Sequence, residues 1–388
     1  MALLLCFAAV LVVAVLLSER FHRSVLSTAV LFLACGFGLG PGALDAFSLP
    51  SGIVLPIAEV ALFTSLFVDG MHAPVSLMRS AWRLPGRALL IGMPLTFFAT
   101  SVLAYAMTGL SWKESFLVGA VLTPTDPVFA AAIVGRRHIP IRLRHLLNVE
   151  SGLNDGLALP VVLVLLSAVS SSHSSVGRVL FDLALGVCFG VVVPWVVLRL
   201  ERLTALGAGG GYEQLSALAI GLLLYGLCKV TDANAFLAAF AGGSCIASLS
   251  PAARDSFARL GEALSELTKL VAIFVFGALV TPALLGRVSV ASWLWAGLLL
   301  VLVRPMSLVV ALVGERLDRK EWASAAWFGP KGFASVTYGL LVMQSSAVHA
   351  VQMFELIAVV VAVSIVAHST TDTIVARAFE APDAQTEM

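Results

Sequence analysis

The sequence predicts an all-α, polytopic membrane protein. Of its 388 residues, 59% are hydrophobic and only 12% are charged, whereas a soluble domain usually carries about 25% charged residues on its surface. Apolar stretches of about 20 residues, the length that crosses a bilayer as a helix, recur from one end of the chain to the other. No polar stretch is long enough for a separate soluble domain, so we expect residues 1–388 to form a single transmembrane domain.

Polar or Gly/Pro-rich breaks divide the chain into about thirteen predicted spans. The first apolar run lacks the basic start and the small-residue cleavage site of a signal peptide, so we interpret it as a retained helix. The spans are expected near residues 1–17, 25–39, 52–69, 87–108, 113–134, 146–169, 178–199, 212–231, 233–249, 262–285, 289–313, 322–345 and 351–377.

Basic residues are distributed unevenly between the loops. With the N-terminus outside, the cytoplasmic segments hold 17 Lys and Arg residues and the outer segments hold 4, while the remaining three of the 24 lie inside spans. Lys and Arg accumulate on the cytoplasmic side of membrane proteins. The asymmetry therefore predicts a multi-pass inner-membrane protein with its N-terminus outside and its C-terminus cytoplasmic, ending in a short tail at residues 378–388.

Two predicted spans are interrupted. The fifth contains Thr-Pro-Thr-Asp-Pro at 123–127, which places Asp126 between two prolines, and the twelfth contains Gly-Pro-Lys-Gly at 329–332 around Lys331. Proline removes a backbone donor and clashes with the preceding turn, so both helices are expected to break. Spans five and twelve stand seven apart, as two inverted six-helix repeats joined by one linker helix would place them. The expected boundaries are about 1–169 for repeat one, 178–199 for the linker helix and 212–377 for repeat two.

The sixth span carries four oxygen-bearing side chains on one side of its helix. Glu150 with Asn154, and Ser151 with Asp155, are spaced four residues apart, which places them on neighbouring turns. Ionisable side chains are costly in hydrocarbon and indicate function by default. Carboxylate, amide and hydroxyl oxygens suit hard cations such as Na+, K+ or Li+. Together with Asp126 of the broken span, this helix predicts a monovalent-cation site inside the membrane.

Three basic residues lie within spans. Arg304 needs a carboxylate partner, for which we expect Glu150. Lys331 is expected to offset the partial charges of the broken helix ends and of Asp126.

For Lys269 we expect a peripheral role, either reaching toward the membrane surface or pairing with Glu266 on its own helix. Asp69 lies at the end of its predicted span, where a solvated or helix-terminal position is expected.

The composition argues against other classes of function. The five cysteines are scattered singly and the seven histidines form no spaced cluster, so neither zinc nor haem is expected and no cofactor beyond transported ions is predicted. A net charge of +1 gives no support to a nucleic-acid partner. We expect no enzymatic activity.

Four motifs together resemble the NhaP-like sodium/proton antiporters of the monovalent cation:proton antiporter-1 family. They are TPTDP at 123–127, ESGLNDG at 150–156, Arg304-Pro305 and GPKG at 329–332. The resemblance spans essentially the whole chain and implies a homodimer in membrane lipid, with a moving core and a dimerisation panel.

The resemblance also implies roles for individual residues. Asp155 looks like the carboxylate shared by cation and proton, with Asp126, Ser151 and the Thr125 carbonyl as further metal ligands for Na+ or K+. Asn154 resembles the neutral partner that replaces a second aspartate in electrogenic relatives.

Three further assignments follow from the same resemblance. Glu150 and Arg304 look like a structural ion pair, and Glu59 looks like a water-linked contributor from the outer side. Many relatives carry Arg where Lys331 stands, so this sequence departs from the family at that position.

A single carboxylate that holds either a cation or a proton couples their fluxes by competition. With Glu150 neutralised by Arg304, we predict electroneutral 1:1 exchange of Na+ for H+. A K+/H+ antiporter is the main alternative, and a sodium-coupled solute symporter, a cation channel and an intramembrane aspartyl protease are rivals that fit less well. The sequence leaves the choice among Na+, K+ and Li+ open, because selectivity depends on fine cavity geometry.

Overall fold

The computed structural model describes residues 1–18, 27–74, 84–126, 139–170, 176–203 and 212–379, and its regular structure within these ranges is entirely helical. Seven described helices are long and apolar enough to cross a membrane: Gly52–His72, Leu84–Thr108, Ile141–Val169, Gly177–Glu201, Gln214–Thr231, Val290–Ala311 and Ala350–Arg377. Four shorter apolar helices accompany them: Ala2–Leu16, Thr28–Leu39, Ala235–Leu249 and Phe333–Met343. The helical class is confirmed, and the total of thirteen crossings stays a prediction.

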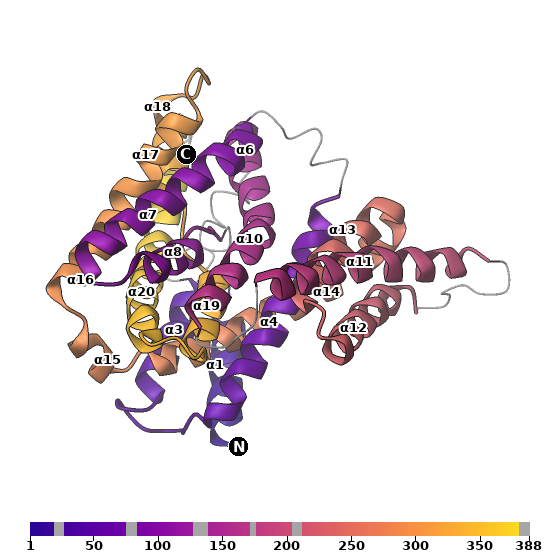
Figure 1. Cartoon of the computed structure of the whole chain (residues 1–388), viewed down its shortest axis with the longest axis horizontal. Helices are drawn as coiled ribbons and strands as arrows, with labels where there is room; N and C mark the ends of the chain where they lie inside the picture. Colours follow the sequence, from indigo (N-terminus) through magenta and orange to yellow (C-terminus); the bar gives the residue numbers. More distant parts are fainter. Residues whose placement is uncertain (19–26, 75–83, 127–138, 171–175, 204–211, 380–388) are drawn as a thin grey trace, which may run out of the picture.

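The contacts between helices divide them into two groups, and Figure 1 shows α11, α12 and α13 of the first group together on one side of the molecule. In the first group α4 packs against α13 and α14, α11 and α12 pack against α13, and α3 packs against α14. The members are α3 (Thr28–Leu39), α4 (Ser51–His72), α11 (Val176–Glu201), α12 (Glu213–Thr231), α13 (Ala235–Leu249) and α14 (Pro251–Leu279), with α1 (Ala2–Leu16) beside α3.

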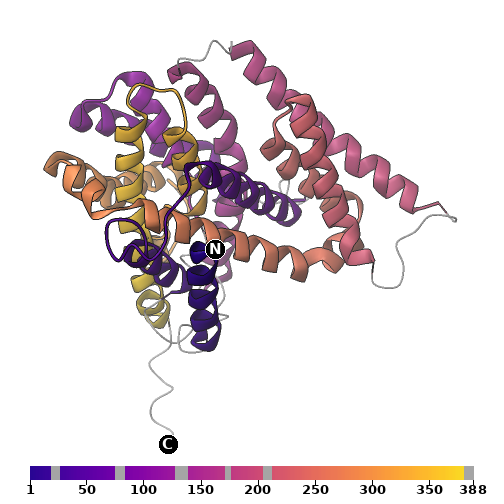
Figure 2. The same ribbon diagram turned by 90° about the horizontal axis from the view of Figure 1, so that it is seen from below.

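The second group contains the interrupted spans. Its members are α6 (Leu84–Arg87), α7 (Met93–Thr108), α8 (Trp112–Val121), α10 (Ile141–Val169), α16 (Val290–Leu298), α17 (Arg304–Ala311), α18 (Arg319–Trp327), α19 (Phe333–Met343) and α20 (Ala350–Arg377), with the short α15 (Pro282–Arg287) leading into it. Figure 2 shows α14 running across the molecule, from the side of α11–α13 toward the side of α16–α20.

One helix boundary differs from the sequence expectation. The tenth span was expected near 262, but α14 begins at Pro251. Ser250 caps it, since its Oγ accepts a hydrogen bond from the Ala253 amide at 3.3 Å, and proline fits the first turn of a helix. The apolar run did not reveal this start, because the first turns of α14 carry charged residues. Those turns are helical but interrupt the run of apolar residues.

The predicted interruptions are described to different extents. In the twelfth span α18 ends at Trp327 and α19 begins at Phe333, so that break is confirmed. In the fifth span α8 ends at Val121, before the Thr-Pro-Thr-Asp segment. The rest of that span, from Pro127 on, lies outside the described residues, as does the predicted tail from residue 380.

Two further irregularities occupy corresponding places. A π-helical turn at Ala88–Gly92 precedes Pro94, and another at Leu299–Val303 precedes Pro305. Proline lacks the amide that would continue an α-helix, and an extra residue in the preceding turn relieves its clash. These turns lie in spans four and eleven, seven apart, as inverted repeats predict.

Glycines bring two helix pairs into close contact. Gly36 of α3 and Gly277 of α14 each face a main-chain carbonyl of the other helix, as do Gly70 of α4 and Gly243 of α13. A Cβ atom at any of the four would overlap that carbonyl oxygen. An inverted repeat exchanges spans two and three with nine and ten, so it would map one pair of contacts onto the other.

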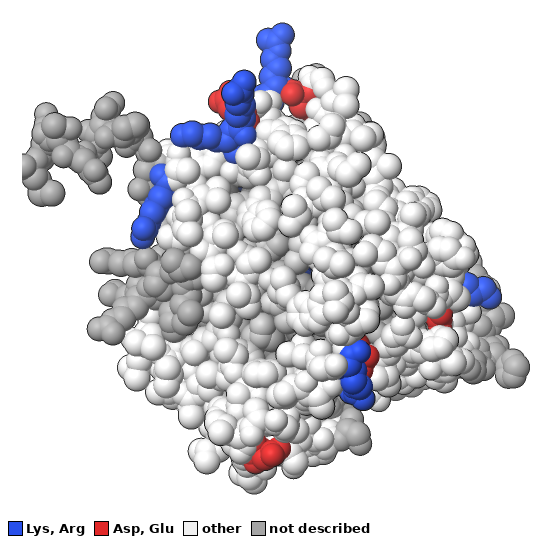
Figure 3. Space-filling view, turned by 90° about the vertical axis from the view of Figure 1, so that its left-hand side faces the viewer, with Lys and Arg blue, Asp and Glu red and all other residues white. Residues whose placement is uncertain are grey.

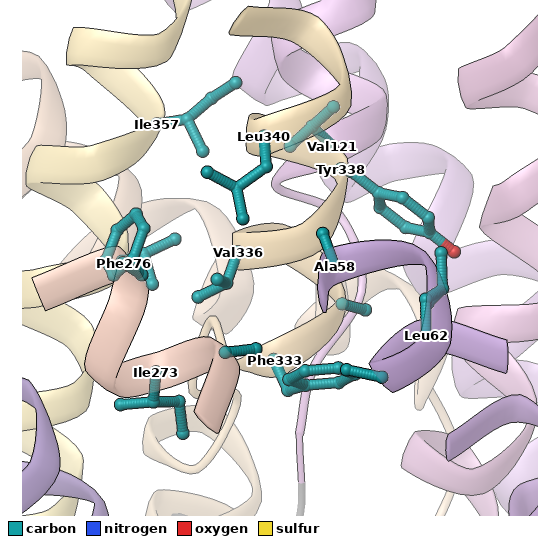
Figure 4. Packing of buried hydrophobic residues seen from close by; sticks show 14 of the residues in the cluster. Ala58, Leu62, Val121, Ile273, Phe276, Phe333, Val336, Tyr338, Leu340 and Ile357 are labelled. Carbon is teal, nitrogen blue, oxygen red and sulfur yellow. The ribbon is translucent and has the colours of Figure 1, made fainter. Parts of the chain in front are cut away.

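Short α19 lies at the centre of the apolar core. In Figure 4, Tyr338 and Val336 of α19 lie among side chains from α4, α8, α14 and α20. The side of the molecule shown in Figure 3 is largely uncharged, and its Lys and Arg side chains lie mainly at the upper end of the view. That distribution suits a belt of lipid between two polar rims.

Replacing Gly243 by alanine should lower the melting temperature of the detergent-solubilised protein, because the new Cβ would overlap the Phe67 carbonyl. Overpacking of this kind costs about 1–3 kcal/mol. Gly226→Ala is the matched control, since nothing lies within 4 Å of a Cβ there and alanine favours a helix over glycine by up to about 1 kcal/mol. Equal melting temperatures for the two variants would contradict the close α4–α13 packing.

Candidate functional site

The two interrupted spans meet and bond to each other through their main chains. The Asp126 amide donates to the Pro330 carbonyl at 2.9 Å, and the Phe333 amide donates to Asp126 Oδ2 at 2.9 Å. Lys331 Nζ donates to the Thr123 carbonyl at 3.2 Å. A carboxylate thus lies at the N-terminus of α19 and an ammonium at the C-terminal end of α8, where each opposes the helix's partial charge. Lys331 thus reaches a broken helix end, as expected, while its expected effect on Asp126 stays a prediction.

The sixth span, α10, contacts the interrupted fifth span through Asn154 and Ser151. Asn154 Nδ2 donates to the Thr125 carbonyl at 3.1 Å and to Thr125 Oγ1 at 2.7 Å. Ser151 Oγ lies 3.3 Å from Thr125 Oγ1. The Tyr338 hydroxyl of α19 donates to the Asp155 main-chain carbonyl at 2.9 Å. These contacts hold the polar face of α10 against the extended end of span five.

Two buried oxygens of this face lack a hydrogen-bond donor. Among the described residues, neither Asn154 Oδ1 nor Asp155 Oδ1 has a partner, although both side chains are buried. An unsatisfied buried polar atom is costly and usually indicates a missing ligand or a function. A hard cation or a proton would satisfy the Asp155 carboxylate. No three His, Cys, Asp or Glu side chains in the described ranges converge into a metal cluster, so oxygens of mixed type would have to hold the ion.

One turn away, Glu150 is fully paired. Arg304 donates from Nη1 to Oε1 at 2.8 Å and from Nη2 to Oε2 at 3.0 Å, and both side chains are buried. Arg304 Nε also donates to the Ala325 carbonyl at 3.1 Å. Gly329 makes room for the guanidinium, since a Cβ there would overlap it. The pair is the one that the sequence suggested, and its bidentate geometry is the strongest form of such a bond.

A cavity of about 510 Å³ leads toward the site between α4, α10 and α14. Its charged lining includes Asp69, Glu266 and Lys269. Among the described residues, Asp69, Asp126 and Lys269 are the charged side chains that act electrostatically on Asp155. Lys269 Nζ also lies 5.9 Å from the centre of the Phe333 ring. Asp69 and Lys269 are therefore part of the site's charge environment.

Asp69 lies in the last turn of α4, in agreement with the expected helix-terminal position, and it lines the cavity. Lys269, expected at the periphery, lines the same cavity. Two polar pairs could have revealed them. Ser65 and Asp69 on α4 are joined by a 3.2 Å hydrogen bond, and Asp69 lines the cavity together with Ser265 and Lys269 of α14. Each pair is spaced four apart, so it marks one face of its helix.

Glu59 lies elsewhere. Lys229 Nζ donates to Glu59 Oε2 at 2.7 Å, and both residues line a second cavity of about 440 Å³. Ten residues of α4 separate Glu59 from Asp69, a rise of about 15 Å. The water-linked role from the outer side that the resemblance implied for Glu59 stays a prediction.

Comparisons with known proteins agree with this architecture. The family model described as "Sodium/hydrogen exchanger, transmembrane" matches residues 7–378. The K(+)/H(+) antiporter NhaP2 of Shewanella baltica is 24% identical over 382 residues, covering 94% of this chain and 64% of the relative. The K(+)/H(+) antiporter NhaP of Alkalimonas amylolytica is 25% identical over 372 residues, with the same coverage of 94% and 64%. The chain thus spans just under two thirds of the length of these relatives.

The fold also matches a solved structure. The sodium proton antiporter MjNhaP1 from Methanocaldococcus jannaschii at pH 8 superposes with a TM-score of 0.76 and 18% identity, covering 96% of each chain. At that identity the likeness shows the shared fold.

Removing one member of the buried ion pair should destabilise the protein. Glu150→Ala leaves the Arg304 guanidinium unpaired in a dry site, which costs about 3–5 kcal/mol and lowers the melting temperature. Removing both charges, in Glu150→Ala with Arg304→Met, should recover part of the loss. The control is Asp255→Ala, since the exposed pair of Asp255 with Arg254 contributes at most about 1 kcal/mol. A Glu150→Ala protein as stable as this control would argue against the pair's structural role.

Proposed function

This chain belongs to the transmembrane sodium/hydrogen exchanger family, and from that premise we propose that it exchanges a monovalent cation for a proton across a membrane. The observation that carries the proposal is Asp155 Oδ1, which is buried where both interrupted helices meet α10 and has no hydrogen-bond partner in the described part of the chain. A bare carboxylate at that depth needs a positive partner. A cation and a proton both meet the need, and one excludes the other.

The ligands of the cation come from residues that already surround Asp155. The Asp155 carboxylate, Asp126, the Ser151 hydroxyl and the Thr125 carbonyl supply oxygens of the kind that Na+ and K+ bind. Asn154 stays neutral and is held by its two bonds to Thr125. Lys331 supports the site by capping α8, and Asp69 faces the approaching ion from the cavity. Glu59, 10 residues along α4, belongs to a separate cavity.

Sodium is the substrate that we propose first, with potassium as the alternative. Potassium is supported by two relatives that are named K(+)/H(+) antiporters. Sodium is supported by the matching solved structure, which is named a sodium proton antiporter. Fluorescence dequenching in everted vesicles, with Na+, K+ and Li+ added in turn, separates them. Counterflow of organic solutes tests the rival sodium-coupled symporter.

The two helix groups suggest how access alternates. The 510 Å³ cavity meets the N-terminal half of α10, and the 440 Å³ cavity meets its C-terminal half. With the orientation given by the basic loops, the first cavity faces the cytoplasm and the second faces outward. Asp155 lies between them, so movement of the α8–α10–α19 group against α4 and α13 would switch its access from one side to the other. The protein acts as a transporter rather than an enzyme, as a homodimer in the inner membrane.

Asp155→Asn should abolish cation-dependent proton movement in proteoliposomes, because an amide neither takes up the proton nor balances the cation's charge. Asp255→Asn, which changes an exposed carboxylate, should leave exchange at the wild-type rate. Added cation should raise the melting temperature of wild type and of the control, and not of Asp155→Asn. Wild-type exchange by the Asp155 variant would remove this residue from the mechanism.

Exchange should be electroneutral, with one cation moved for each proton. Glu150 and Arg304 neutralise each other, and Asn154 does not titrate, so Asp155 alone changes its partner during the cycle. In proteoliposomes clamped with valinomycin and K+, the initial rate of Na+-driven exchange should not change with membrane potential. A rate that follows the potential would mean that a second group changes charge.

A further inference from the structure

The last helix presents a polar face to the interruption of span twelve. Ser364, His368 and Thr371 of α20 are spaced four and three residues apart, which places them on one side of the helix. Ser364 and His368 are buried. None of the three belongs to the cation site described above, and polar side chains buried in a membrane helix require partners.

Their partners lie at the two edges of the break. The Lys331 amide, at the start of α19, donates to Ser364 Oγ at 2.7 Å. Trp327 is the last residue of α18. Its carbonyl lies 3.0 Å from His368 Nε2, and its Nε1 donates to Thr371 Oγ1 at 2.9 Å. The Trp327 and His368 rings stack with their centres 4.9 Å apart. One helix face thus holds both ends of segment 328–332.

The two ring nitrogens of His368 contact different helices. Its Nδ1 lies 3.1 Å from Ser364 Oγ and 2.8 Å from the Ser364 carbonyl, both on α20 itself. Its Nε2 faces the Trp327 carbonyl of α18, and because a carbonyl only accepts, this contact requires a hydrogen on Nε2. Among the described residues, Nε2 is therefore the ring atom that joins α20 to the break.

The same relation exists in the other half of the chain. There, α10 follows the interrupted span five and holds it through Asn154, whose amide donates to the Thr125 carbonyl. In the second half, Ser364 and His368 of α20 bond to the main chain at the break at 328–332, as Asn154 of α10 bonds to the main chain at 123–126.

We propose that Ser364, His368 and Thr371 are positioning residues for cation binding, a role that rests on the exchange function proposed above. They fix segment 328–332. The Pro330 carbonyl of this segment and the amide of the next residue, Phe333, hold Asp126. If the segment shifts, Asp126 and the adjoining Thr125 carbonyl shift with it. Cation affinity then falls, although α20 touches no ion.

Glutamine and asparagine separate the two ring nitrogens of His368. A glutamine amide reaches the place of Nε2 and can donate to the Trp327 carbonyl, whereas an asparagine amide reaches only the place of Nδ1. The variants are His368→Ala, His368→Asn, His368→Gln and Ser364→Ala. Thr370→Ala is the control on the same helix, since Thr370 Oγ1 bonds only to carbonyls of α20 itself.

Two measurements read the effect in full-length protein. The first is the apparent KM for Na+, with K+ in parallel, in proteoliposomes. Loss of one buried hydrogen bond corresponds to about a tenfold rise, expected for Ser364→Ala, His368→Ala and His368→Asn. His368→Gln should return close to wild type. The second is deuterium uptake by the peptide around residues 328–333, which should rise in the same three variants, while Thr370→Ala changes neither quantity.

The proposal is overturned if His368→Ala keeps the wild-type KM and deuterium uptake. It is equally overturned if His368→Gln and His368→Asn show the same KM and deuterium uptake, because the contact of Nε2 with the Trp327 carbonyl would then contribute nothing to cation binding. Deuterium uptake does not depend on transport, so the hold on the break is tested separately. A wild-type protein that exchanges no cation would defeat the proposed function itself.

Discussion

The mutual capping of the two interrupted helices is the interaction on which the rest of the structure depends. An amide or carbonyl without a partner costs several kcal/mol inside a membrane, so broken helices survive there only if other groups replace the lost bonds. Asp126 accepts the first amide of α19, and Lys331 donates to the end of α8. Each charge opposes the partial charge of the helix end that it faces. The extended segment before Asp126 can therefore present its Thr125 carbonyl to α10.

Two carboxylates just over one turn apart on α10 have opposite roles for a physical reason. Glu150 receives two parallel bonds from Arg304, so its charge is balanced permanently. Asp155 has no such partner among the described side chains, and its Oδ1 accepts nothing. The pair anchors α10 to α17, and the acid without such a pair is the one proposed to exchange cation for proton. Between them, the Asn154 amide donates both of its hydrogen bonds to Thr125, and this side chain adds no charge.

Spacing along single helices was enough to predict part of the candidate site. Ser151, Asn154 and Asp155 share a helix face, and prolines mark the break that carries Asp126; these features are local, so the sequence displays them. The same reasoning paired Arg304 with Glu150 because few partners were available within the spans. It missed Asp69 and Lys269, whose significance depends on α4 and α14 lying side by side at the cavity. Its further assignment, Glu59 of α4, pairs with Lys229 at the second cavity, and its water-linked role stays a prediction.

Local sequence was enough to predict the helical class, most limits of the described spans apart from the start of α14, the break in span twelve and the end of α8 before Thr123. Those properties follow from apolar length, helical period and proline chemistry, which act within about 20 residues of chain. Tertiary structure decided which helix ends cap each other, which acid is left without a donor, and that Ser364 and His368 of α20 hold the second break. These depend on contacts between residues more than 30 positions apart in the chain, and helical periodicity carries no information about which faces meet.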